Sequence, residues 1–238
     1  MNLLDLTLPD AAANLALDEA LLLEAEEGRA SEVLRLWEAP GYAVVMGAGG
    51  SVAIDVNVSA CEADRVPILR RASGGGTVVL GPGCLCFTLV LRTDRASGLD
   101  LIQPSTRYVL DRILNAVHPI VPESRIEGTS DLTVNGVKFS GSAQQRKRRF
   151  FLHHGTLLAG FDLGRLSHYL QPPERQPQYR SARPHAEFMM NLPATIGELK
   201  RRLIAEWEPA GDYEPVPLEM VQGLIAEKYG RDAWNRRR

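Results

Sequence analysis

The chain has 238 residues, a hydrophobic fraction of 45% and a formal net charge of −2 at pH 7. These values predict one large domain with a full core, and they give no general signal for nucleic-acid binding. No apolar run is long enough to cross a membrane, and the first residues lack the basic and then apolar order of a signal peptide. We therefore expect a cytoplasmic protein whose partners include neither a membrane nor a nucleic acid.

The three cysteines, Cys61, Cys84 and Cys86, form no metal-ligand pattern. An odd number of cysteines favours a reducing compartment, in which thiols stay free. Cys84 and Cys86 lie two residues apart in an apolar run, so both face the same side of a predicted strand. We expect them to be buried small hydrophobic residues that take no part in the chemistry.

The first part of the chain shows helix and strand patterns in turn. Residues 10–27 predict an amphipathic helix whose polar face carries acidic side chains, among them Asp18 and Glu19. Two short strands, a short helix and a further strand follow, at residues 33–37, 42–46, 57–65 and 66–69.

Two arginines and then three consecutive glycines follow that last strand, in the stretch from Arg70 to Val79. Adjacent glycines are costly to order, and they are kept where the backbone needs positive φ or lies against a ligand. Backbone N–H groups beside arginine side chains suit a phosphate or a carboxylate. A plain hairpin turn is the alternative. The stretch matches neither a P-loop nor a dinucleotide-binding fingerprint.

The middle of the chain contains a strongly apolar strand at residues 84–91 and a helix at 103–117. The dipeptide Asn135-Gly136 lies between two alternating runs and predicts a β-hairpin with a type I′ turn. Such a turn would pair Thr133 with Lys138, Leu132 with Phe139 and Asp131 with Ser140.

This predicted register places Lys138 on a polar sheet face, close to Asp131 and Ser140. Gly141 would let a ligand or another backbone approach that face closely. A solvated outer face is the alternative interpretation.

The charged run from Arg146 to Arg149 predicts a solvated hairpin tip or a docking surface for an acidic partner. In the next strand, residues 150–159, His153 and His154 face opposite sides, so they form a poor metal site and only one of them can face a pocket. The remaining predicted segments are a helix, a proline-rich irregular stretch, two closing helices and a partly frayed tail, at residues 162–170, 171–191, 195–207, 217–229 and 234–238.

Four motifs resemble, in order, those of the lipoate–protein ligase A family, which shares a core with biotin–protein ligases and octanoyltransferases. The matching stretches are 70–78, 130–132, 137–143 and 153–158. The resemblance implies an α/β (α+β) fold with mixed β-sheets flanked by helices around an acyl tunnel. It also implies a single catalytic domain over residues 1–238, with 195–238 as its closing helical segment and no C-terminal accessory domain.

The resemblance further implies roles for individual residues. Lys138 would be the catalytic residue and would contact the acyl carbonyl and the phosphate. The implied substrate- and nucleotide-binding residues are Arg71, Ser73, Gly74, Gly75, Gly76, Thr77, Val78, Val79, Asp131, Lys138, Ser140, Gly141 and His154. ATP and Mg²⁺ are the implied cofactors, lipoate or octanoate is the substrate, and no protein side chain is identifiable as a metal ligand.

The implied reaction activates the carboxylate as an acyl-adenylate and transfers the acyl group to a lysine of an acceptor, a lipoyl-domain or H-protein-like protein. A separate accessory subunit would supply adenylation if this chain does not. Two alternatives stay open, an ATP-independent octanoyl or lipoyl transferase and a non-catalytic lipoate-binding homologue. Some thioester-forming relatives place their cysteine in the stretch that is 126–130 here, and this chain has none there. Leu80 and Gly81 also depart from the His and Asp that the family often has.

Overall fold

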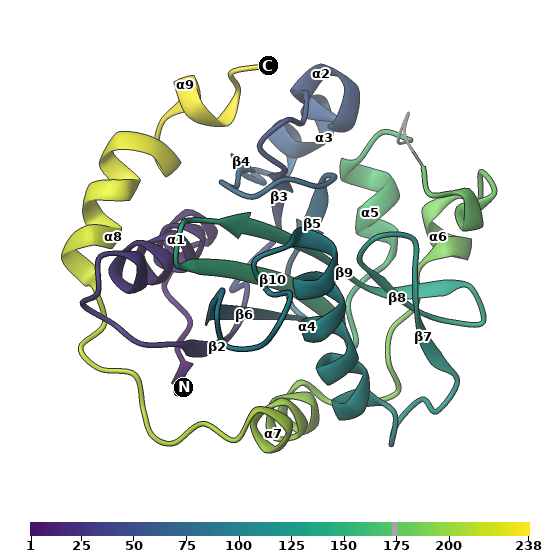
Figure 1. Ribbon diagram of the computed structural model, residues 1–238. Coiled ribbons are helices and arrows are strands. Elements are labelled where there is room, and N and C mark those ends of the chain that lie inside the picture. The colour runs from purple at the N-terminus through teal and green to yellow at the C-terminus, as the bar shows by residue number, and fades with distance from the viewer. Residues whose placement is uncertain (173–175) are drawn as a thin grey trace.

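The computed structural model describes residues 1–172 and 176–238. Its centre is a seven-stranded mixed sheet, beside which lies a three-stranded sheet (Figure 1). The large sheet contains, in spatial order, β1 (Asn2–Asp5), β2 (Val33–Glu38), β6 (Cys84–Arg92), β10 (Phe150–Leu158), β9 (Val137–Arg146), β8 (Asp131–Val134) and β7 (Ser124–Glu127). The small sheet contains β4 (Ile68–Arg70), β3 (Ala43–Met46) and β5 (Val78–Leu80).

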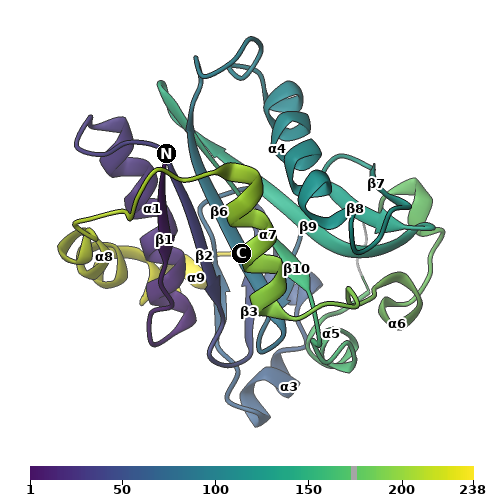
Figure 2. The same cartoon turned by 90° about the horizontal axis from the view of Figure 1, so that it is seen from below.

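Helices cover both faces of the large sheet (Figure 2). On one face lie α4 (Ile102–Val117) and α7 (Ile196–Trp207), and on the other lie α1 (Ala11–Glu26), α8 (Leu218–Leu224) and the small sheet. The shorter helices are α2 (Val52–Asp55), α3 (Val58–Ala63), α5 (Gly164–Tyr169), η1 (Gln178–Arg180), α6 (His185–Phe188), η2 (Ile225–Tyr229) and α9 (Asp232–Asn235). This mixed architecture confirms the predicted fold class. No helix in the described part of the chain is long and apolar enough to span a membrane.

Strand β6 is apolar along almost its whole length because its two faces pack into two different cores. Cys84 and Cys86 pack into the core beneath α1, whereas Leu85, Phe87 and Leu89 pack into the core beneath α4 and α7. A strand buried on both faces reads as a continuous apolar run and not as an alternating one. The three cysteines are free and buried, as predicted.

Helix α1 forms where it was predicted, and the side chain of Asp10 caps it by accepting from the N–H of Ala13. The predicted polar face of α1 is not solvated at Asp18 and Glu19, whose exposed fractions are 3% and 7%. Helix α8 and η2 pack over this side of α1, so Glu19 instead pairs with Lys228.

The hairpin β8–β9 contains the predicted pair of Thr133 with Lys138. Beyond this pair, the register predicted from the sequence is wrong. A bulge shifts the pairing, so that Leu132 lies opposite Ser140 and Asp131 lies opposite Gly141. One extra residue on β9 therefore moves Ser140 into the interior, where it is fully buried.

The tail is ordered against the small sheet, so the prediction of fraying is wrong. The indole N–H of Trp234 donates to the carbonyl of Arg70 over 2.8 Å, and the amide oxygen of Asn235 accepts from the N–H of Arg70 over 3.0 Å. Two predicted closing helices are confirmed as α7 and as α8, which continues into η2. The predicted proline-rich stretch 171–191 contains η1 and α6, and its residues 173–175 lie outside the described ones.

The charged run is a hairpin tip, and two of its four residues are bound to neighbouring segments, the loop before α4 and helix α1. The guanidinium of Arg146 donates to the carbonyl of Leu99 over 2.6 Å, and the N–H of Arg149 donates to Glu26 over 2.9 Å. Within this run, only Lys147 and Arg148 are exposed without a side-chain partner among the described residues.

Candidate functional site

A cavity of about 190 Å³ is lined by residues of α1 and of both sheets. Much of its wall is apolar, with Leu15, Trp37, Val45, Val78, Leu80 and Phe87. Charged and polar side chains complete the lining, chiefly Asp18, Arg71, Thr88, Asp131, Lys138 and His154. The cavity therefore suits a ligand with an apolar chain and a charged end.

Arg71 is a buried cation without an acidic partner. Its pKa is lowered to about 10 by burial, so it stays charged at neutral pH. Its guanidinium donates to Ser73 Oγ over 3.0 Å and to the carbonyls of Gly74 and Gly76 over 2.6 and 2.9 Å, and no carboxylate in the described part of the chain pairs with it. A buried charge held only by neutral groups favours an anionic ligand.

The glycine-rich loop is not a hairpin turn, because β4 and β5 lie on opposite sides of β3 and do not pair with each other. Its backbone at Gly75 has a φ of +88°, and a Cβ there would lie 2.8 Å from Nη2 of Arg71. Glycine is thus required for the loop to pass close over the arginine, as the sequence predicted.

The neighbouring Arg70 has a structural role. It is fully buried, and its guanidinium donates to the carbonyls of Gly50 over 2.7 Å, Gly47 over 3.1 Å and Trp234 over 3.1 Å. These bonds join the 47–50 loop to the tail and leave only Arg71 to face the cavity.

Lys138 lines the cavity with its amine 2.7 Å from Oδ1 of Asp131. The hydroxyl of Tyr179 donates to the other carboxylate oxygen over 2.6 Å. A Cβ at residue 141 would lie 2.8 Å from Nζ of Lys138, so Gly141 makes room for the lysine itself. The exposed fractions of the lysine and aspartate side chains are 21% and 15%, which excludes a fully solvated face.

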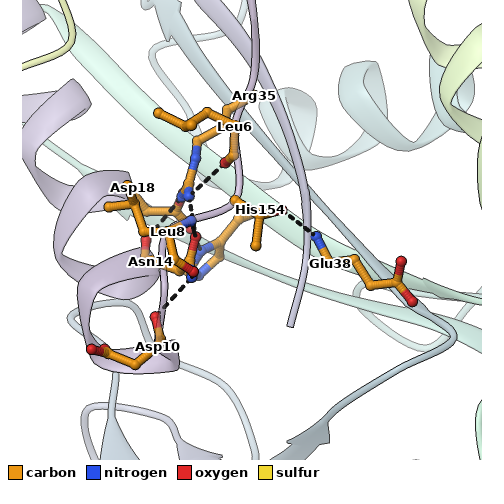
Figure 3. Close-up of polar contacts among 9 residues, drawn as sticks. Leu6, Leu8, Asp10, Asn14, Asp18, Arg35, Glu38 and His154 are labelled. Carbon is orange, nitrogen blue, oxygen red and sulfur yellow. Dashed lines mark hydrogen bonds and ion pairs between the residues drawn. The ribbon is translucent and has the colours of Figure 1, made fainter. Parts of the chain in front are cut away.

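The two histidines face opposite sides of β10, as predicted. The Nε2 atom of His154 lies 2.6 Å from Ser73 Oγ, and its Nδ1 atom lies 3.2 Å from Oδ2 of Asp18. Figure 3 shows Asp18 and His154 meeting beside Arg35, whose Nη1 donates to Asp18 over 2.5 Å. His153 is fully buried, and burial lowers its pKa to about 3, so it is neutral.

The structure brings most of the predicted site residues together. Those that line the cavity are Arg71, Gly75, Gly76, Thr77, Val78, Asp131, Lys138, Gly141 and His154. Ser73 and Gly74 lie behind this lining and bind Arg71. Val79 belongs to the core, and Ser140 is buried with no partner for its hydroxyl among the described residues, so neither reaches the cavity.

The cavity residues that the sequence interpretation missed include Asp18, Trp37 and Thr88. The Nε1 atom of Trp37 and the hydroxyl of Thr88 are buried and have no hydrogen-bond partner in the described structure. Arg35 is the sequence feature that could have indicated the burial of Asp18, because a charge inside an otherwise apolar strand requires a buried partner.

The residues that the structure describes contain no group of three or more His, Cys, Asp or Glu side chains that could hold a metal ion. Asp131 is already engaged by Lys138 and Tyr179. Any Mg²⁺ would therefore be held chiefly by the phosphates that it accompanies, as is usual for this ion.

A mixed α/β domain with an apolar cavity, an unpaired buried arginine and a lysine–aspartate pair is suited to an anion that carries an apolar chain. A family model described as the lipoyl protein ligase A/B catalytic domain matches residues 10–207. The chain belongs to this family.

Curated relatives resemble the chain over about two thirds of its length. A Mycoplasma pneumoniae protein named as a probable lipoate–protein ligase A is 36% identical over 157 residues, which are 66% of this chain and 45% of that protein. A protein of Aeropyrum pernix, likewise named a lipoate–protein ligase A, is 36% identical over 160 residues, which are 67% of this chain and 58% of that protein. The chain thus spans about half the length of these relatives.

Solved structures share the whole fold at low sequence identity. A Thermoplasma acidophilum protein with bound lipoic acid has a TM-score of 0.84 at 21% identity and covers 100% of this chain and 98% of its own. A lipoate–protein ligase A bound with ATP has a TM-score of 0.83 at 22% identity, with 99% and 98% covered. A bi-partite lipoate protein ligase of Thermoplasma acidophilum has a TM-score of 0.83 at 22% identity, with 99% and 95% covered.

Proposed function

We propose that the protein is a lipoate–protein ligase, which activates lipoate or octanoate with ATP and transfers the acyl group to a lysine of an acceptor protein. One observation carries the proposal: Arg71 is a buried cation with no acidic partner, and it lines the same apolar cavity as Lys138. An acyl chain fits the apolar wall, and its carboxylate or adenylate fits the two cations.

The first step is attack of the lipoate carboxylate on the α-phosphate of ATP, which forms a mixed anhydride and releases pyrophosphate. In the second step the acceptor amine attacks the anhydride carbonyl, AMP leaves and the amine loses a proton. Both steps develop negative charge on oxygen, and Lys138 and Arg71 are the cations that would stabilise it. No nucleophile from the protein is needed, because positioning and charge suffice.

The relatives support the choice of acid and nucleotide. Similar folds have been solved with lipoic acid and with ATP, and the family model is that of a ligase catalytic domain. Mg²⁺ would enter with the triphosphate and neutralise part of its charge.

The ligase is favoured over a transferase that forms a cysteine thioester. Cys86 lines the cavity, but burial raises the pKa of its thiol well above the ordinary value. The neutral thiol is a weak nucleophile. The stretch 126–130, where some thioester-forming relatives carry their cysteine, contains none here.

We infer a lipoyl-domain or H-protein-like acceptor and a separate accessory subunit for adenylation. A bi-partite lipoate protein ligase with this fold, solved as part of a lipoylation system with its E2 lipoyl domain, supports both inferences. Lys147 and Arg148 are the free charges at the hairpin tip and are the residues that an acidic acceptor surface would meet.

Intact-mass spectrometry of an apo lipoyl domain tests these proposals. The domain is incubated with this protein and lipoyl-AMP, then with lipoate plus ATP, then with octanoate plus ATP. Transfer from lipoyl-AMP alone supports a ligase domain that depends on an accessory subunit, and transfer from lipoate plus ATP supports an autonomous ligase. No mass increase under any of these conditions would contradict the proposed function.

A further inference from the structure

Five side chains form one continuous network from β2 to the glycine-rich loop, in the order Arg35, Asp18, His154, Ser73, Arg71. The four links measure 2.5 Å from Nη1 to Oδ1, 3.2 Å from Oδ2 to Nδ1, 2.6 Å from Nε2 to Oγ and 3.0 Å from Oγ to Nε. We call this set the Arg35–Arg71 network. Its members come from four separate parts of the chain, so the fold assembles it.

Elementary chemistry determines the two ends of the network. Arg71 can only donate, so the Ser73 oxygen accepts from it. The Asp18 carboxylate can only accept, so Nδ1 of His154 donates to it, and in this tautomer Nε2 accepts from the Ser73 O–H. Burial alone would raise the pKa of Asp18, but Arg35 and His154 together hold it below the ordinary value, so Asp18 is an ionised acceptor.

The Arg35 end of the network is rigidly anchored. Arg35 is fully buried and also donates to the backbone carbonyl of Asn14 over 2.9 Å, to its side-chain oxygen over 2.5 Å and to the carbonyl of Leu6 over 3.2 Å (Figure 3). Its guanidinium also lies 5.2 Å from the ring centre of Trp37, a residue of the cavity wall. These contacts fix the position of Arg35 and therefore that of Asp18, which is bonded to it.

The Arg71 end of the network controls the loop that lines the cavity. Arg71 donates to the carbonyls of Gly74 and Gly76, so the orientation of its guanidinium and the path of the loop are set together. Ser73 is 2% exposed and does not line the main cavity, which excludes it as a nucleophile despite its Ser–His–Asp neighbours. Its remaining role is to hold Nε of Arg71.

We propose that Asp18, His154 and Ser73 are positioning residues, which act in series to fix Arg71 and the glycine-rich loop for the ligand anion. The identity of that anion, the acyl-adenylate, rests on the proposed function. Asp18 thus acts on the anion site through His154 and Ser73.

The tautomer of His154 tests the network without any activity. In protein labelled with ¹⁵N at histidine, the resonances of His154 are assigned by their loss in His154→Gln. The network predicts protonation on Nδ1 in the wild type and also in Ser73→Ala, because Asp18 still accepts from Nδ1 there, together with a changed ¹⁵N chemical shift of Nε2, which loses its donor. A wild-type ring protonated on Nε2, or an Nε2 chemical shift unchanged in Ser73→Ala, would overturn the proposal.

A double-mutant cycle tests whether the network acts as one unit on the ligand. Lipoyl-AMP binding is measured by calorimetry for Asp18→Asn, Ser73→Ala and the double variant. We expect affinity losses on the order of a hundredfold for Asp18→Asn and tenfold for Ser73→Ala, because a small misplacement is costly. The double variant should lose no more than Asp18→Asn alone, since both changes break the same series. Additive losses would contradict the proposal.

The control is Glu38→Gln, on the same strand as Arg35, because Glu38 accepts from the N–H of Gly83 and touches no member of the network. The loss of lipoyl-AMP affinity caused by Glu38→Gln should add to the loss caused by Ser73→Ala. If Asp18→Asn does not fold, the cycle is run with His154→Gln and Ser73→Ala, which keep the buried ion pair of Arg35 with Asp18. If the wild type neither binds lipoyl-AMP nor transfers its acyl group, the proposed function is contradicted. The tautomer measurement still shows in that case whether the network exists.

Discussion

The amine of Lys138 occupies space that exists only because residue 141 is glycine. A Cβ at position 141 would lie 2.8 Å from Nζ and 3.0 Å from Cε of Lys138. The bulge in β9 brings Gly141 opposite Asp131, so the residue that makes room for the amine also faces its ion-pair partner. The extra residue in β9 thus places Gly141 beside the pair of Lys138 with Asp131 that lines the cavity.

Gly141→Ala should displace Lys138 while the fold is kept. The crowded atoms belong to the end of a flexible side chain, so we expect little change in the urea midpoint. Transfer from lipoyl-AMP should fall on the order of a hundredfold, as expected for a misplaced catalytic group. Single-turnover kinetics check this, with Gly41→Ala as the control because no atom lies within 4 Å of its Cβ position. Activity within threefold of the wild type would remove this role of Gly141.

Cys86→Ala should retain acyl transfer within a few-fold, although Cys86 lines the cavity. Its raised pKa keeps the thiol protonated, and no step of the proposed reaction uses it. The measurements are the transfer rate and the intact mass of the wild type after incubation with lipoyl-AMP. An acyl adduct on Cys86, together with loss of transfer in the variant, would instead support the thioester mechanism.

His153 should make the stability of the fold depend on pH below neutrality. Its pKa is about 3 when folded and about 6.5 when unfolded, so between these values the unfolded chain binds a proton that the folded chain does not. Stability is therefore lost as the pH falls through this window. We expect the wild type to lose about 2 kcal/mol more than His153→Leu between pH 7 and pH 5. Urea unfolding of both proteins at each pH provides the test, and parallel pH profiles would contradict it.

The sequence was sufficient to predict the main elements, and most of its predicted site residues do line the cavity, because those signals are local. The glycine-rich loop, the Asn135-Gly136 turn and the separation of His153 from His154 follow from short spacing rules. The bulge was not predictable in this way, since hairpin geometry alone favours an unshifted register. Ser140 was consequently assigned to the polar face and is in fact buried.

The longer-range features escaped the sequence interpretation for a common reason. Asp18 and Glu19 look solvated in an isolated helix, and their burial depends on Arg35 and on η2, which are distant along the chain. The same holds for the tail, whose packing on Arg70 joins residues more than 160 positions apart. Local patterns identify which residues are polar, whereas only the fold shows which of them are partners.

Asn235→Ala should destabilise the protein by about 2 kcal/mol, because it leaves the buried N–H of Arg70 without its acceptor. It also removes the donor to the carbonyl of Tyr229, at 2.8 Å. Urea denaturation measures the loss, and Asn115→Ala, an exposed change on α4, should stay within about 0.5 kcal/mol of the wild type. Asn235→Asp keeps the acceptor for Arg70, so it should recover part of the stability. Equal midpoints for Asn235→Ala and the wild type would show that the tail contributes nothing to folding.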